Sequence, residues 1–310
     1  MRMGRDAGGG SLAGVALAVL ATLLWSSAFV CGRYLLGGER PLMDPYTLVL
    51  VRFVVGSAVV FGLAALRGQP LGIGRRQWPL LAGTSLFMYT LMSVFNFCGQ
   101  RTVSATMAAL ILESGPALLF LVWNMVCGRR LSWAEWVSVL GGALGCMLVL
   151  NIVTLSGIQV GGSALGQLLL LASALCWVVG SVWNQRLMMR ADSKLALVGW
   201  CQLAGAVMML PVLAVCREGL VLPRTGLAWA AAVCVGVFPT ALAFVAWGEA
   251  AARLPLWQLS LMQNLTPVFT LLAASLLLGE PATMLNVVGM ALVVASLSLA
   301  VLAGRRPSDA

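Results

Sequence analysis

The sequence predicts an all-α polytopic membrane protein with ten transmembrane helices arranged as two inverted five-helix repeats. Of the 310 residues, 61% are hydrophobic and only 9% are charged, whereas roughly a quarter of the residues in soluble domains are charged. Apolar segments of about twenty residues recur along the chain, and each is long enough to cross the roughly 30 Å hydrocarbon core of a bilayer as a helix. Markers of the first half also return in the second half at a nearly constant offset.

The ten expected spans lie between two short tails, 1–11 and 305–310. The first apolar segment is too long for the core of a signal peptide and leads to no small-residue cleavage site, so we expect it to be retained. The spans form a first repeat at 12–155 and a second at 160–304. In order, they are Leu12–Leu35, Pro45–Leu66, Trp78–Cys98, Ser104–Cys127, Trp133–Asn151, Ser163–Leu187, Leu195–Val215, Gly226–Gly248, Pro255–Leu278 and Met284–Ala303.

The distribution of positive charge predicts the orientation in the membrane, because Lys and Arg gather on the cytoplasmic side. With a cytoplasmic N-terminus, thirteen of the 19 Lys and Arg residues fall on the cytoplasmic side, five fall outside and Arg52 lies within a span. We therefore expect a multi-pass protein of the plasma (cytoplasmic or inner) membrane with both termini in the cytoplasm. The net charge of +9 follows this bias, and we expect the lipid bilayer, and no nucleic acid, as a partner.

Residue pairs at offsets of 149 to 152 relate the two halves. They are Trp25 with Trp177, Pro116 with Pro267, Gly128 with Gly279, Phe95 with Phe244 and Gly99 with Gly248. Because each half holds five spans, an odd number, the second copy begins on the opposite side of the membrane from the first. Inverted repeats are typical of secondary transporters, which bind substrate near the midplane between the halves.

Glu113 is an ionisable residue close to the middle of the fourth span. A charge at that depth costs about 2.5–3.5 kcal/mol on insertion scales, so such a residue usually faces a cavity or a partner. Pro116 lacks an N–H and clashes with the carbonyl four residues before it, which releases the carbonyl of Leu112 beside Glu113. The sequence therefore predicts a polar site at a helix break.

The second repeat contains the same break, since Asn264 stands three residues before Pro267 as Glu113 stands before Pro116. The carbonyl released there is that of Gln263. Pseudo-symmetry would bring Glu113, Gln263 and Asn264 to a common central region. Three roles are open for Glu113: binding a cationic or amino group of the substrate, titrating as a proton-coupling acid, or forming a structural ion pair with Arg52. For Arg52 itself we favour a structural or snorkelling role.

Several uncharged side chains are further candidates for the cavity wall. Deep aromatic rings recur at positions related by the repeat or close to Phe244, and in the third span two polar residues stand seven apart, on one helix face. Packing of the aromatic rings and helix–helix hydrogen bonding of the polar residues are the alternatives. The candidates are Trp25, Trp177, Phe244, Trp247, Tyr89 and Asn96.

The residues that are missing limit the chemistry. The chain has no histidine, and its eight cysteines are scattered singly, as buried small hydrophobes would be. No P-loop, Ser–His pair, zinc motif or aspartyl dyad is present, so we expect no metal, no cofactor and no enzyme activity. An intramembrane enzyme acting on lipid or peptide stays the rival interpretation.

The markers together resemble the EamA family of the drug/metabolite transporter superfamily. The resemblance rests on Trp25 and Trp177, Arg52, the two prolines, and "LLLGEPAT" with Gly279 and Glu280; the first repeat departs from this pattern with Arg129 after Gly128. It implies ten helices with cytoplasmic termini, and a central cavity lined mainly by the third, fourth, eighth and ninth helices. It also implies export of small metabolites or amino acids.

We therefore predict a secondary-active transporter that exports a small amino acid or amine-bearing compound by alternating access. A single central carboxylate with amides and aromatic rings suits an aminated substrate. Nucleotide sugars and sugar phosphates are a weaker alternative, because no central cluster of Arg or Lys is visible to meet phosphate. The sequence predicts neither the coupling ion nor the oligomeric state. Glu280, near the start of the last helix, is expected to act as a helix cap.

Overall fold

The structure is a computed structural model. It describes residues 12–113, 163–188, 192–215, 221–251, 253–254, 262–263, 265–280 and 283–303, together with single residues and short pairs between 133 and 158. Pro116 and Asn264, two of the predicted site residues, lie outside this part of the chain.

Within these described residues, six long apolar helices have the length and composition of a membrane span. They correspond to the first, second, third, sixth, seventh and eighth predicted spans, with bounds that differ from the predicted ones by three residues or fewer. Four of them are regular helices: α1 (Leu12–Leu36), α2 (Pro45–Leu66), α7 (Ala164–Met188) and α8 (Lys194–Val215).

The other two long helices each change geometry at their centre. The third span runs through η1 (Arg75–Gln77), α3 (Trp78–Thr84), η2 (Ser85–Leu91) and α4 (Met92–Gln100), and the eighth through α9 (Gly226–Val235), η3 (Gly236–Leu242) and α10 (Ala243–Ala251). Both η2 and η3 are π-helical segments of 7 residues, and they lie 151 residues apart, which is the offset of the sequence repeat. Short π segments inside α-helices are frequent at functional sites.

The remaining described elements follow the predicted order. Helix is also formed over 105–113, at the start of the fourth predicted span, and α12 (Thr266–Leu278) and α13 (Met284–Ala303) occupy the ninth and tenth. The all-α prediction missed two short strands, β1 (Val153–Thr154) and β2 (Gly157–Ile158), which pair antiparallel between the two halves. Most of the fifth predicted span lies outside the described residues.

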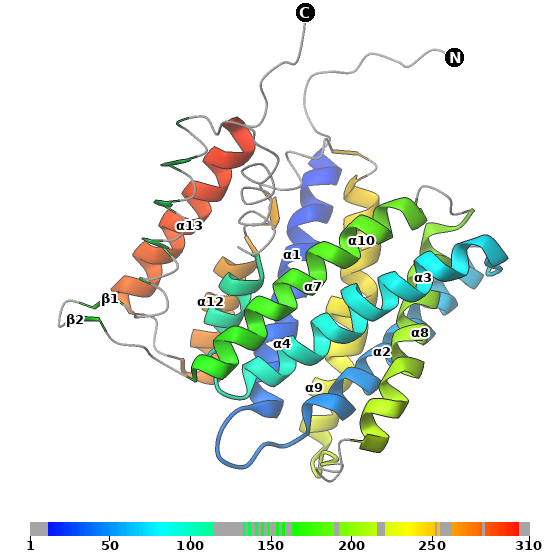
Figure 1. The fold of residues 1–310 in the computed structure, drawn as a ribbon, viewed down its shortest axis with the longest axis horizontal. Coiled ribbons are helices and arrows are strands. Elements are labelled where there is room, and N and C mark those ends of the chain that lie inside the picture. Colours follow the sequence, from blue (N-terminus) through cyan, green and yellow to red (C-terminus); the bar gives the residue numbers. More distant parts are fainter. Residues whose placement is uncertain are drawn as a thin grey trace, which may run out of the picture.

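The helices form one bundle, with α1 between α12 on one side and α10 on the other (Figure 1). The most extensive helix contact joins α2 to α8. Small residues allow this close contact between helices. A Cβ on Gly56 of α2 would lie 2.7 Å from side-chain atoms of Gln202 and Thr240, so those side chains approach the α2 backbone closely. The start of α1 and the end of α13 lie at the same edge of the bundle, at the top of Figure 1, as an even number of spans requires.

Candidate functional site

A cavity lies near the middle of the bundle. Its wall comes from both halves of the chain, and most of it is apolar and rich in aromatic rings. Among the described residues, its charged and amide side chains are one carboxylate, one guanidinium and two amides. The lining residues are Trp25, Ala28, Phe29, Arg52, Met92, Asn96, Leu112, Glu113, Trp177, Pro239, Phe244 and Gln263.

Glu113 and Gln263 join the two halves at this cavity. The Gln263 side-chain amide donates a hydrogen bond of 2.8 Å from Nε2 to Oε2 of Glu113. Asn96 lies in the same wall and is 3% exposed, and its Oδ1 accepts a hydrogen bond of 3.2 Å from Nε2 of Gln100, one turn further along α4. Each amide therefore has a hydrogen-bond partner that orients it, and the second oxygen of the Glu113 carboxylate has no partner among the described side chains.

Arg52 lies in the wall of this cavity and does not pair with Glu113. Its Nε donates to the Thr240 hydroxyl at 2.7 Å, and its Nη1 contacts the Ser93 hydroxyl at 3.4 Å. The structural ion pair between Arg52 and Glu113, one of the roles open from the sequence, is thus not formed in this structure. Because Glu113 accepts from Gln263 and Arg52 donates to hydroxyls, both charges lie in the cavity wall without neutralising each other.

The acceptor for Arg52 depends on the π segment η3. Pro239 has no N–H, so it cannot donate to the carbonyl of Val235 as a helix residue normally does. In a π segment the backbone hydrogen bond reaches one residue further, to Thr240; the Thr240 hydroxyl also donates to the Val235 carbonyl, at 2.6 Å, and its lone pairs stay available to Arg52. The backbone carbonyl of Thr240 accepts in turn from Nε2 of Gln202 on α8, at 2.8 Å. The irregular helix thereby places a fixed acceptor at the cavity.

A second cavity adjoins the first. Phe244 lines both cavities. Its ring stacks on Tyr89 with centroids 6.0 Å apart and meets the edge of Trp25 at 5.9 Å, while Trp25 and Trp247 lie 4.9 Å apart. These four rings form an aromatic layer between the two spaces.

The structure separates the predicted site residues into three groups. Tyr89 and Trp247 line the second cavity and not the central one. Pro267 lies in the first turn of α12, which begins at Thr266, where a missing N–H costs no helix hydrogen bond. Six of the residues come together in the central cavity: Trp25, Asn96, Glu113, Trp177, Phe244 and Gln263.

Comparison with known proteins places the whole chain in one family. The model of the EamA-like transporter family matches residues 12–151 and again 164–302. This chain belongs to the EamA-like transporter family. It is therefore a multi-pass membrane protein from a family of transporters.

Two relatives of this EamA-like transporter carry different names. A "Probable terminal-alkyne amino-acid exporter" of Streptantibioticus cattleyicolor is 29% identical over 292 residues, which cover 91% of each chain. A "Biotin transporter" of Salmonella typhimurium is 25% identical, again over 91% of each chain. A solved protein structure matches with a TM-score of 0.68 over 96% of this chain and 98% of that chain; at 24% identity, it supports the fold alone.

Sequence reasoning missed several residues of the EamA-like site. Phe29, Met92 and Leu112 line the central cavity but look like ordinary apolar helix residues. Thr240 and Ser93 give no signal of their own either. Pro239 was the detectable sign, because a proline in the middle of a predicted span removes a helix hydrogen bond that another group must replace.

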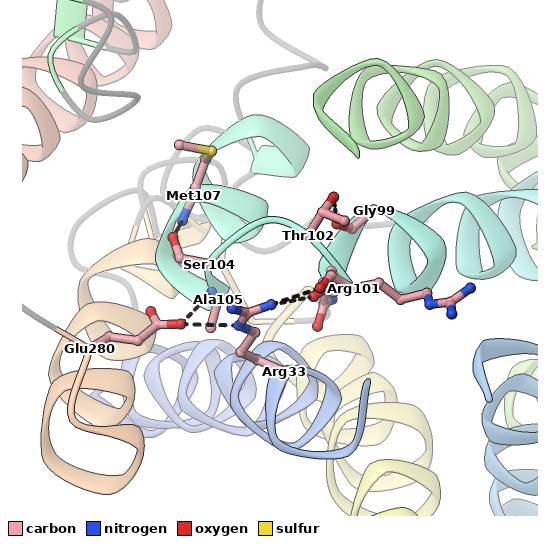
Figure 2. A network of polar contacts seen from close by, with 9 residues as sticks. Arg33, Gly99, Arg101, Thr102, Ser104, Ala105, Met107 and Glu280 are labelled. Carbon is pink, nitrogen blue, oxygen red and sulfur yellow. Dashed lines mark hydrogen bonds and ion pairs between the residues drawn. The ribbon is translucent and has the colours of Figure 1, made fainter. Parts of the chain in front are cut away.

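Glu280, part of the EamA-like marker "GE", caps a different helix from the one expected. Its Oε1 accepts from the backbone N–H of Ala105 at 3.1 Å, at the start of the helix over 105–113, and lies 3.7 Å from Nε of Arg33. Figure 2 shows Arg33 between Glu280 and the chain at Arg101; its Nη1 donates to the carbonyls of Gln100 and Arg101 at 3.1 and 3.0 Å. The helix that follows Glu280 is capped instead by Thr283 and Asn286, which exchange hydrogen bonds between side chain and backbone.

Proposed function

We propose that this EamA-like transporter is a secondary-active carrier that exports an amino acid or a similar small aminated metabolite. Its central cavity is the binding site, and access alternates between the two faces of a plasma (inner) membrane as the inverted repeats move. Glu113 binds the ammonium group of the substrate, and the aromatic wall packs against the rest of the molecule.

The contact between Glu113 and Gln263 is the observation that carries this proposal. It joins a carboxylate of one half to an amide of the other inside the central cavity. A carboxylate with one oxygen held by an amide keeps the other oxygen for a charge-assisted hydrogen bond, which is stronger than a neutral one. Relative motion of the halves would also change the surroundings of Glu113, as alternating access requires.

The relatives support a small organic substrate without agreeing on its identity, since one is named for an amino acid and the other for biotin. The cavity's own groups favour the aminated class. Among the described residues, its wall carries one negative and one positive side chain, and a single guanidinium is too little positive charge for a nucleotide sugar or sugar phosphate.

Transport by the purified protein in liposomes tests the proposal. We expect labelled phenylalanine or leucine to accumulate by counterflow only when unlabelled substrate is trapped inside. Glu113→Gln should lower this counterflow about 10- to 100-fold, as expected for the loss of a hydrogen bond to a charged group. Glu39→Gln, which changes an exposed acid in the loop between α1 and α2, should leave it unchanged. Full counterflow in Glu113→Gln would remove Glu113 from substrate binding.

The proton-coupling role of Glu113 gives a different result in the same liposomes. If Glu113 carries the coupling proton, Glu113→Gln loses uptake driven by a pH gradient but keeps counterflow, because exchange needs no net proton movement. A loss of both activities assigns Glu113 to the substrate.

A further inference from the structure

Arg52 is a buried cation without an acidic partner among the described residues. Its side chain is 6% exposed, and two hydroxyl groups are its hydrogen-bond acceptors there. Four acidic side chains have other partners. Asp44 caps α2 at Thr47, and Glu113 accepts from Gln263. Glu249 pairs with Arg67 and Arg253, and Glu280 pairs with Arg33. The guanidinium has five N–H donors, and the described residues accept from only two of its nitrogen atoms.

An uncompensated charge in a low-dielectric interior is strongly unfavourable unless something neutralises it. The aromatic neighbours of Arg52 offset part of this penalty: its Cζ lies 5.6 Å from the ring centroid of Phe53 and 5.6 Å from that of Phe97. They leave the charge itself in place. A buried, uncompensated cation in a cavity wall can bind an anionic group of a ligand that enters the cavity.

The guanidinium is also held in a defined orientation. Thr240 fixes Nε from the second half of the chain, and Ser93 contacts Nη1 from α4 of the first half. The Thr240 hydroxyl is itself fixed by the carbonyl of Val235. A guanidinium oriented in this way presents parallel N–H groups, and their geometry matches a carboxylate better than a point charge does.

We propose that Arg52 binds the carboxylate of a zwitterionic α-amino acid whose ammonium group contacts Glu113. This inference rests on the proposed function and names the substrate class for the same cavity. Cation and anion lie in one wall, unpaired with each other, so a ligand that carries both opposite charges satisfies both at once. The remaining wall, with Trp25, Phe29, Trp177 and Phe244, favours an apolar or aromatic side chain.

Transport selectivity gives the test, with three probes that share a phenyl group. Phenylalanine has both charges, phenethylamine lacks the carboxylate and 3-phenylpropionate lacks the amine. The wild type should prefer phenylalanine over phenethylamine, and Arg52→Gln should lower this preference about 10- to 100-fold. Glu113→Gln should instead lower the preference for phenylalanine over 3-phenylpropionate. Arg76→Gln, which removes an exposed cation outside both cavities, should keep both preferences.

A ratio of two fluxes measured on one preparation does not depend on how much protein is active. An unchanged ratio in Arg52→Gln, including an equal loss of both fluxes, would overturn the role of Arg52. If the glutamine variant does not survive purification, Arg52→Lys is measured in the same way. Lysine keeps the charge without the paired donors, so its ratio should also fall. Failure of the wild type to carry any aminated probe would overturn the proposed function itself.

Discussion

Thr240 connects three parts of the central site through one residue. Its hydroxyl donates to the carbonyl of Val235 and accepts from Arg52. Its backbone carbonyl accepts from Gln202. A buried polar group without a hydrogen bond costs about 1–3 kcal/mol, and the loss of this hydroxyl would leave Nε of Arg52 without its acceptor.

Thr240→Val should therefore destabilise the protein while keeping the shape of the side chain. We expect the free energy of unfolding to fall by about 1–3 kcal/mol, which lowers the midpoint of thermal unfolding in detergent by several degrees. Thr240→Ser keeps the hydroxyl and is the matched control, with a midpoint close to that of the wild type. Equal midpoints for the valine and serine variants would show that the hydroxyl does not hold η3.

Residue chemistry alone could predict only part of this site. Glu113 and Gln263 were predictable because a charge and a repeated proline are rare in apolar spans. The role of Thr240 was not, because hydroxyl groups usually bond to the preceding turn of their own helix. Whether such a hydroxyl also lies within reach of Arg52 depends on the path of the backbone.

At the scale of the elements, each helix end needs partners for its unpaired backbone groups. Some caps are local in sequence. Asp44 directly precedes Pro45 at the start of α2, and its carboxylate accepts from the N–H of Thr47 at 2.8 Å. The cap formed by Glu280 is not local, because its carboxylate accepts a hydrogen bond from the N–H of a residue 175 positions away. Two helix ends that are distant in sequence are thus joined by one carboxylate.

Glu280→Ala should cost more stability than the loss of an exposed ion pair. It removes a helix cap and the partner of Arg33 at a side chain that is 17% exposed, and a lost cap costs about 0.5–2 kcal/mol. Glu249→Ala is the control, because that side chain is 41% exposed and exposed pairs contribute about 0–1 kcal/mol. Thermal unfolding of the two variants in the same detergent compares them. A larger loss in Glu249→Ala would contradict the capping role.

The packing of α7 on η2 depends on a missing side chain. A Cβ on Gly180 would lie 2.5 Å from the backbone nitrogen of Met88, and backbone cannot move aside cheaply. Gly180→Ala should therefore lower the free energy of unfolding by about 1–3 kcal/mol, as overpacking does. Gly62→Ala places the same methyl group on α2 where no atom lies within 4 Å. There the better helix propensity of alanine should leave stability unchanged or raise it by up to about 1 kcal/mol. Equal unfolding midpoints would argue against this close contact.

At the scale of the whole molecule, the start of α1 and the end of α13 share one edge of the bundle (Figure 1). Long apolar segments and an odd repeat were enough to predict six spans to within three residues. They were not enough for η2 and η3, because a π segment adds no change in composition to a run that stays apolar throughout.

Fusion reporters at defined positions test the predicted orientation. A fluorescent protein at the C-terminus should be bright, and alkaline phosphatase fused there or after Arg67 should be inactive, because both points are expected in the cytoplasm. Phosphatase fused after Arg40, in the loop between α1 and α2, should be active. The opposite pattern would invert the predicted topology and with it the direction assigned to the carrier.

Phe244 has a further consequence for how this carrier can be blocked. The larger of the two cavities that it separates has charged walls that include Arg67, Asp192, Lys194 and Glu249. This space lies at the end of the bundle away from the contact between Glu280 and Arg33, since Arg253, paired with Glu249, neighbours Gly14 at the start of α1. A bulky amphiphile that binds in this space and cannot pass Phe244 would inhibit transport from one face of the membrane only. Raising the concentration of substrate on the other face would not relieve this inhibition.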